Sequence, residues 1–227
     1  MRTPARLTAT LCFLLAAAAQ AQTAPTAAEA AAYGGLHAAA WRGDAAQVAA
    51  LGTPAEVKKR DAHGRTALHV AAFARQRAAI EALAKAGADL GALENDRYDA
   101  VTIAAVADDE ETLRTLLALG ASAKLITSRY DGTALIAAAH LGHDGVVRQL
   151  IAAGAPLDHV NNLHWTAVIE AIVLGNGGAR HRATLKALID AKANLQLVDR
   201  SGRSPLQLAR ERGYAEMVAM LERAGAR

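Results

Sequence analysis

His140, His143 and Asp144 are the residues whose types and spacing come nearest to a chemical site. Two histidines three positions apart can share a helix face, and imidazole combined with a carboxylate can bind a metal ion or transfer a proton. Gly142 lies between the histidines, however, and predicts the end of a helix at that point. A hydrolase or metal-dependent enzyme that uses these three residues is one hypothesis, and metal analysis would test it.

Other patterns that could support catalysis are weaker. The sequence has no HExxH zinc motif, no GxSxG nucleophile elbow, no P-loop and no GxGxxG fingerprint. The glycine-rich stretch 176–180 follows a predicted helix, whereas a phosphate-binding loop follows a strand. The acidic run 108–111 is typical of a helix start, where carboxylates lie near the positive end of the helix dipole. We therefore predict no catalytic residue, no cofactor and no bound metal.

The helices that would carry these residues can be predicted from one stretch, Tyr130–Asp158. Thr133 can cap a first helix, which Gly142 ends, and Asp144 can cap a second helix, which ends near Gly154. The large apolar residues of the two helices lie on one face, and nothing within the stretch is large enough to cover it. This helix–turn–helix unit therefore requires a neighbour to pack against.

The neighbours are copies of the same unit. Residues that correspond to Thr133 recur every 32 to 38 positions, which indicates a repeat array. A large aliphatic residue followed by a small one lets stacked helices lie close together. The marker residues are Gly34, Thr66, Asp99, Thr133, Thr166 and Ser204. Two positions after each marker come Leu36, Leu68, Val101, Leu135, Val168 and Leu206, and three positions further come Ala39, Ala71, Ala104, Ala138, Ala171 and Ala209.

The repeated unit resembles the ankyrin repeat. The stretches 61–72, 131–143 and 199–209 are similar to the turn and first helix of that family. The resemblance covers roughly residues 33–227 and implies an all-α solenoid of about six helix–turn–helix repeats with short β-hairpin-like turns. The repeats of this ankyrin-like domain, residues 34–227, are placed at 34–60, 61–93, 94–126, 127–160, 161–198 and 199–227.

Residues 1–21 predict a secretory signal peptide. Arg2 and Arg6 precede an apolar run of thirteen residues, and the small residues Ala19 and Ala21 suit cleavage before Gln22. The run is too short to span a bilayer, which takes about twenty residues. We therefore expect a periplasmic or secreted protein without stable membrane insertion once the signal is removed.

The charge balance gives no indication of a nucleic-acid partner. The chain carries 25 basic and 22 acidic residues, a formal charge of +3. Removing Arg2 and Arg6 with the signal leaves 23 against 22, or +1. Nucleic-acid binding usually shows as a clustered basic surface, and none is evident. Cys12 is the only cysteine and falls in the predicted signal, so an exported product would be held by its core and not by disulfides.

The segment 22–33 is predicted to be a lead-in and a capping helix. Residues 22–25 are expected to form a disordered lead-in at the start of the exported chain. Thr26 and Glu29 form a capping-box pattern, which predicts a short helix as far as Tyr33. This helix would cover the exposed end of the first repeat.

Repeat five departs from the others at two points. It has five extra residues near 176–180, which we predict to form a flexible loop between its helices. Lys192 stands where other repeats have glycine in a left-handed conformation, and a side chain there costs roughly 1 kcal/mol. The corresponding glycines are Gly87, Gly120, Gly154 and Gly225.

One set of side chains is left free for binding. In an ankyrin array the two residues after the inner alanine pair face the concave side, and five of the six such pairs here contain a large apolar residue. Aromatic residues supply much of the binding energy of interfaces, and an exposed apolar strip marks a contact surface. The predicted partner-binding residues are Trp41, Arg42, Phe73, Val106, His140, Leu141 and Val173 on the helices, with His63, Tyr98, Tyr130 and Trp165 at the hairpin tips.

We therefore predict a non-enzymatic, monomeric module that binds a protein partner outside the cytoplasm. The array resembles exported bacterial ankyrin-repeat proteins, and this resemblance implies roles such as protecting or inhibiting an exported enzyme or toxin. Two alternatives stand beside this prediction. One is the enzyme with His140, His143 and Asp144, and the other is a structural oligomer stacked through the exposed ends of the array.

Overall fold

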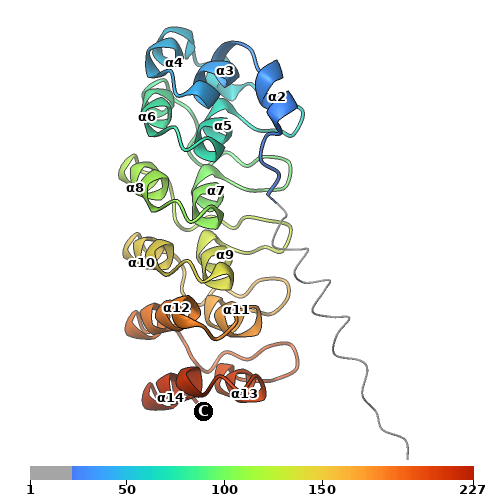
Figure 1. Ribbon diagram of the computed structural model, residues 1–227, viewed down its shortest axis with the longest axis vertical. Coiled ribbons are helices and arrows are strands. Elements are labelled where there is room, and N and C mark those ends of the chain that lie inside the picture. Colours follow the sequence, from blue (N-terminus) through green and yellow to red (C-terminus); the bar gives the residue numbers. More distant parts are fainter. Residues whose placement is uncertain (1–21) are drawn as a thin grey trace, which may run out of the picture.

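The computed structural model describes residues 22–227, which fold into an elongated stack of helix pairs (Figure 1). The predicted signal peptide, residues 1–21, lies outside the described residues. The first helices of the pairs lie one on the next, the second helices form a row beside them, and hairpin loops project from the other side. No helix within residues 22–227 has the length and apolar character needed to cross a membrane. The pairs are α3 (Gly35–Arg42) with α4 (Ala45–Leu51), α5 (Ala67–Phe73) with α6 (Arg77–Lys85), α7 (Ala100–Val106) with α8 (Glu110–Ala118), α9 (Ala134–Leu141) with α10 (Asp144–Ala152), α11 (Ala167–Val173) with α12 (Ala179–Asp190), and α13 (Pro205–Glu211) with α14 (Ala215–Arg223).

The predicted marker residues are the N-caps of the first helices. Thr133, for example, has an extended backbone, and its hydroxyl accepts a hydrogen bond from the N–H of Ile136 at 3.3 Å. Gly142 ends the same helix in the left-handed conformation, with φ of 70°. The prediction for Asp144 was wrong by one position, because α10 begins at Asp144 itself and its N-cap is His143. The Asp144 carboxylate instead pairs with Arg148 one turn along the helix, at 2.7 Å.

The core consists of the aliphatic and alanine positions predicted from the repeat. All six inner alanines are buried, with at most 1 % of their surface exposed. Because alanine adds little bulk, successive first helices can lie close enough for the larger residues to pack between the layers. The predicted all-α stack of helix pairs is confirmed, and within residues 22–227 the extended pairing is confined to one bridge between Thr127 and Gly132.

Backbone hydrogen bonds join the hairpin loops of repeats two to five along the stack, and the side chain of Arg200 in repeat six donates to the carbonyl of Asn162 at 2.9 Å. The backbone N–H of Asn95 donates to the carbonyl of His63. In the same way, the N–H of Ser128 donates to the carbonyl of Arg97, and the N–H of Asn162 donates to the carbonyl of Tyr130. The three donor–acceptor distances are 2.9–3.0 Å. The short helix η2 (Glu56–Lys58) leads into the first of these loops. The loops therefore form a continuous wall that faces the first helices, and we call the surface between them the concave groove.

The N-terminal end of the stack is covered by α2 (Ala27–Ala32), which begins with the predicted capping box of Thr26 and Glu29. The residues before it do not behave as the predicted disordered lead-in. Pro25 is buried, and the carbonyl of Thr23 accepts a hydrogen bond from Arg65 at 3.1 Å. Residues 22–24 lie against the ends of α5 and α7 and so occupy part of the concave groove.

The insertion in repeat five is only partly a loop, which corrects the prediction for residues 176–180. Residues 179 and 180 begin α12, so the extra chain lengthens that helix at its N-terminus. The remaining loop is tied on both sides: the ring of His181 lies 3.0 Å from Oδ1 of Asn176, and the hydroxyl of Tyr214 donates to the carbonyl of Gly175 at 2.9 Å.

Lys192 adopts the left-handed conformation predicted for it, with φ of 69°. Replacing Lys192 with glycine is expected to stabilise the protein by about 1 kcal/mol, because the strain on the side chain disappears. The midpoint of thermal unfolding should rise by about 2–4 °C in a chain of this length. Ala191→Gly is the matched control, because Ala191 has φ of −76° and gains nothing from glycine. A lower midpoint for Lys192→Gly than for the wild type would contradict the strain argument.

Candidate binding cavity in the concave groove

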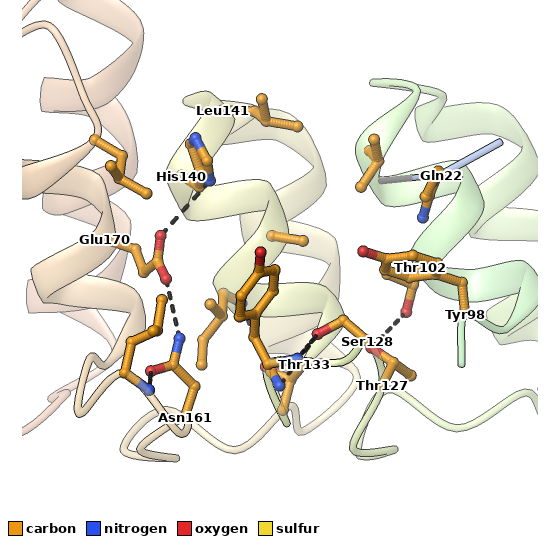
Figure 2. Close-up of a pocket in the computed structure, with 17 residues that line it drawn as sticks. Gln22, Tyr98, Thr102, Thr127, Ser128, Thr133, His140, Leu141, Asn161 and Glu170 are labelled. Atoms are coloured by element: carbon orange, nitrogen blue, oxygen red, sulfur yellow. Dashed lines mark hydrogen bonds and ion pairs between the residues drawn. The ribbon is translucent and has the colours of Figure 1, made fainter. Parts of the chain in front are cut away.

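A cavity of about 130 Å³ lies in the concave groove across repeats three to five (Figure 2). Its helical wall comes from α7, α9 and α11, and its outer wall comes from the hairpin loops that precede these helices. Three successive first helices contribute because their concave sides are in register along the stack. The lining residues are Gln22, Tyr98, Thr102, Val106, Thr127, Ser128, Tyr130, Gly132, Thr133, Ile136, Ala137, His140, Leu141, Asn161, Leu163, Glu170 and Leu174.

Glu170 is the charged residue at one end of this cavity, and it projects from α11 toward α9 (Figure 2). Only 4 % of the residue is exposed. One carboxylate oxygen, Oε1, accepts a hydrogen bond from Nδ2 of Asn161 at 3.0 Å. The other oxygen, Oε2, is buried, and no donor within residues 22–227 forms a hydrogen bond with it. Glu170 therefore presents one unpaired acceptor to the cavity.

Asn161 holds Glu170 in place through the turn that precedes α11. Its side-chain Oδ1 accepts hydrogen bonds from the backbone N–H groups of Leu163 and Trp165, both at 3.0 Å. This leaves the amide Nδ2 free to donate to Glu170. In repeats two and six the same turn position is aspartate, which would repel a neighbouring carboxylate. Asparagine at position 161 is therefore what makes a buried glutamate tolerable here.

His140 faces Glu170 from α9, with Nδ1 3.6 Å from Oε2 (Figure 2). That separation is too long for a hydrogen bond. Burial raises the pKa of Glu170 to about 8, although the Asn161 hydrogen bond opposes the shift. Burial also lowers the pKa of His140 to about 4, and the neighbouring His181 and His143 lower it further. The pair therefore holds a single proton at neutral pH.

The structure does not bring together the three residues of the enzyme hypothesis. His140 faces Glu170, whereas Nδ1 of His143 lies 2.9 Å from the carbonyl oxygen of Ala105. Asp144 pairs with Arg148 and, at 3.4 Å, with Arg180. Within residues 22–227, no group of three or more His, Cys, Asp or Glu side chains is arranged to hold a metal ion. His140 thus lies in the cavity while its two proposed partners have other contacts.

Five of the predicted partner-binding residues line the cavity: Tyr98, Val106, Tyr130, His140 and Leu141. Tyr98 differs from the prediction in one respect, because it is buried with 8 % of its surface exposed and so does not project from a hairpin tip.

The other predicted residues lie outside the cavity. Phe73 lines a shallower hollow of the groove next to residues 22–24. Trp41, Trp165 and Val173 are partly buried and pack against the core. Arg42 and His63 are exposed; the first donates to Gln47 at 2.8 Å, and Nε2 of the second lies 2.9 Å from Glu29 on the capping helix.

Glu170 and Asn161 are the functional candidates that the sequence reasoning missed, although a signal for Glu170 was present. Four positions after the marker, the other repeats have an apolar residue, and repeat five alone has a charged one. A charge in an otherwise apolar column indicates a buried polar group with a specific partner. The apolar residues of that column are Ala38, Val70, Ile103, Ala137 and Leu208.

Comparison with known proteins is consistent with this architecture. The family model for ankyrin repeats (3 copies) matches residues 36–127, 101–181 and 135–227. The ankyrin repeat protein YahD of Escherichia coli (strain K12) is 34 % identical over 190 residues, which is 83 % of this chain and 94 % of that protein.

Solved structures show the same fold. An ankyrin repeat domain from Acinetobacter baumannii AYE is 44 % identical, with a TM-score of 0.79 over 85 % of this chain and 98 % of that one. A chain from the complex of a predatory endopeptidase of Bdellovibrio bacteriovorus with an immunity protein is 22 % identical, with a TM-score of 0.69 over 84 % of this chain and 98 % of that one. At that identity the likeness extends to the fold alone.

Proposed function

Because the chain belongs to the ankyrin-repeat family, we propose that it is a non-enzymatic module that holds a protein partner in its concave groove. The observation that carries this proposal is the open cavity between α7, α9 and α11, whose walls are mostly apolar and include two tyrosines. Tyrosine combines a large contact area with a polar tip and is enriched at interfaces. A groove of this kind suits a segment of another protein better than it suits a reaction.

Residues 22–24 support an extended peptide as the bound segment. They are not helical, and they lie in the groove beside Phe73 and Val106. Gln22 also reaches the edge of the cavity in Figure 2. The groove therefore already accommodates one short non-helical segment of its own chain, and the cavity that Gln22 lines extends from there to α9 and α11. We expect a partner to contribute a similar segment to the remaining part.

The location of the partner follows from the proposed signal peptide. A periplasmic or secreted module would meet other exported proteins, and protection or inhibition of an exported enzyme or toxin is the role we propose. The similar Bdellovibrio bacteriovorus chain comes from a complex of an endopeptidase with an immunity protein. That complex is an example in which a chain with this fold binds a protein partner.

Affinity capture from a periplasmic extract, followed by mass spectrometry and a binding titration with the identified protein, tests this proposal. A variant with Phe73, Tyr130 and Trp165 all changed to alanine is expected to bind that protein at least tenfold more weakly, because it loses three large side chains from the helices and loops that bound the groove. Its circular-dichroism spectrum should match that of the wild type.

A triple variant on the opposite side provides the control. Leu117, Ile151 and Met220 are partly buried apolar residues on the second helices α8, α10 and α14, and they pack against the same core. Changing them to alanine removes similar contacts without touching the groove, so binding should stay within about twofold of the wild type. Equal binding by both triple variants would place the interface outside the concave groove.

A further inference from the structure

The unpaired oxygen of Glu170 points to a specific chemical group in the occupant of the cavity. Glu170 lines the cavity, and its Oε2 is buried at the edge of that cavity, yet no donor within residues 22–227 satisfies this oxygen. We propose that the cavity is a subsite for a primary ammonium group, which a partner protein supplies as a lysine side chain inserted against Glu170. The identity of the donor as a partner's lysine rests on the proposed function, whereas ammonium binding by the cavity does not.

An ammonium group would complete the hydrogen bonding of Glu170. A buried acceptor without a donor is unfavourable in a folded protein, and a donor that also carries a positive charge forms the stronger type of hydrogen bond with a carboxylate. His140 does not provide this contact, because its Nδ1 remains 3.6 Å from Oε2. Binding of an ammonium group at Oε2 would therefore displace the proton that Glu170 holds at neutral pH and give the resulting carboxylate a charged donor.

The geometry favours an ammonium over a guanidinium group. Arginine binds carboxylates best with two parallel hydrogen bonds, one to each oxygen. At Glu170 that arrangement is disfavoured, because Oε1 already accepts from Asn161 at 3.0 Å and would have to accept a second hydrogen bond. Lysine presents a compact charge that needs only the one free oxygen.

The shape and lining of the cavity suit the alkyl part of lysine. Ile136, Leu163 and Leu174 provide apolar walls, and Tyr98 and Tyr130 provide aromatic ones. An aliphatic chain packs on such walls, and an ammonium group is attracted to the face of an aromatic ring. The volume of about 130 Å³ is close to that of an engineered cavity of about 150 Å³ that binds benzene. A four-carbon chain with its ammonium group is of comparable size.

A titration with n-butylammonium, which has the chain and charge of a lysine side chain, tests the proposal without any partner. The purified, isotope-labelled protein is followed by NMR at pH 8, close to the pKa of Glu170. We expect saturable shifts confined to the cavity residues and the Glu170 carboxyl carbon. n-Butanol, n-propylguanidinium and butyrate, at the same ionic strength, should each bind at least tenfold more weakly.

Two variants show whether the carboxylate is responsible. Glu170→Gln keeps an oxygen for Asn161 but loses the charge, and it should bind n-butylammonium at least tenfold more weakly than the wild type. Glu81→Gln, on the exposed face of α6, removes a carboxylate elsewhere and should bind as the wild type does. Equal binding of n-butanol and n-butylammonium, unchanged binding by Glu170→Gln, or no saturable binding at all would each overturn the proposal.

The two proposals can fail separately. If no partner is captured by the groove, a positive n-butylammonium titration still establishes the ammonium subsite. If n-butylammonium does not bind while the partner is captured and depends on Phe73, Tyr130 and Trp165, the groove is an interface and the lysine subsite is wrong.

Discussion

Replacing Arg65 with alanine is expected to lower the free energy of unfolding by about 3 kcal/mol, because the arginine is a buried charge with several partners. Its side chain is 1 % exposed and lies 2.6 Å from Asp61 and 2.7 Å from Glu29. A third nitrogen donates to the carbonyl of Thr23 at 3.1 Å. These contacts join the first hairpin loop to the capping helix α2 and to the segment before it. Removing the guanidinium leaves Asp61 largely buried without its cation.

The loss of stability in Arg65→Ala should be concentrated at the N-terminal end of the stack. Each repeat of a solenoid contacts only its neighbours, so a weakened end can open without the rest. Hydrogen exchange of the amides in α2 should therefore become faster in Arg65→Ala, while exchange in α9 and α11 should change little. Two contacts between this end of the chain and the loop would remain: Tyr33, at the end of α2, donates to Asp61 at 2.7 Å, and His63 lies 2.9 Å from Glu29.

Arg203→Ala provides a matched control within the same chain. Arg203 occupies the same position of repeat six and pairs with Asp199 at 2.7 Å, but its side chain is 44 % exposed. Both variants leave an aspartate without its cation, and Asp199 is itself only 3 % exposed. Arg203, however, is half-exposed and has no contact with a capping helix, so the control should lose clearly less stability than Arg65→Ala in urea unfolding. Similar losses in the two variants would show that burial does not strengthen the contacts of Arg65.

The features that could be predicted from the sequence are those that depend on nearby residues and recur. A threonine, aspartate or serine N-cap acts on an N–H three residues away, and the buried alanines repeat in the same register in every unit. The missed features depend on distant contacts. Thr23 is held by an arginine 42 residues further along the chain, and no local pattern distinguishes it from a disordered lead-in.

The candidate site was predicted in part for the same reason. The repeat register identified Val106, His140 and Leu141 as groove residues because concave positions recur with the period of the fold. The burial and hydrogen bonding of Glu170 could not be predicted from the repeat register. They depend on Asn161 in the preceding turn and on the cavity that forms between three helices. The prediction of a loop at the insertion was wrong in part because its glycines are typical of loops. Ala179 and Arg180 favour helix, and they extend α12 at its N-terminus.

The stability of the wild type is expected to fall as the pH rises from about 6.5 to 8, because the folded protein keeps a proton on Glu170 that the unfolded chain has lost. The Glu170 pKa of about 8 in the folded protein compares with an ordinary value of 4.5, and the His140 pKa of about 4 compares with 6.5. Between pH 4.5 and 6.5 these two residues hold one proton in total in both the folded and the unfolded state. Their titration therefore does not change the stability in that pH range. Above pH 6.5 the unfolded chain has released its proton while the folded pair keeps it.

The folded state then binds more protons than the unfolded state, so its stability must decrease with rising pH. At 1.36 kcal/mol for each pKa unit, the decrease between pH 6.5 and 8 is about 2 kcal/mol. Other groups near the pair are His143 and His181, the latter with Nε2 2.9 Å from the carbonyl of His140. On α13, Glu211 is paired with Arg203. These groups are present in the wild type and in a Glu170 variant, so their effects cancel in a comparison of the two.

Urea unfolding of the wild type and of Glu170→Gln at a series of pH values measures this effect. The variant has no carboxyl group to hold the extra proton, so its stability should stay level between pH 6.5 and 8 and exceed that of the wild type by a growing margin. Glu81→Gln should follow the wild-type curve, because Glu81 is exposed on α6. Parallel curves for the wild type and Glu170→Gln would mean that Glu170 is already ionised in the folded protein at neutral pH, with His140 or a bound cation compensating its charge.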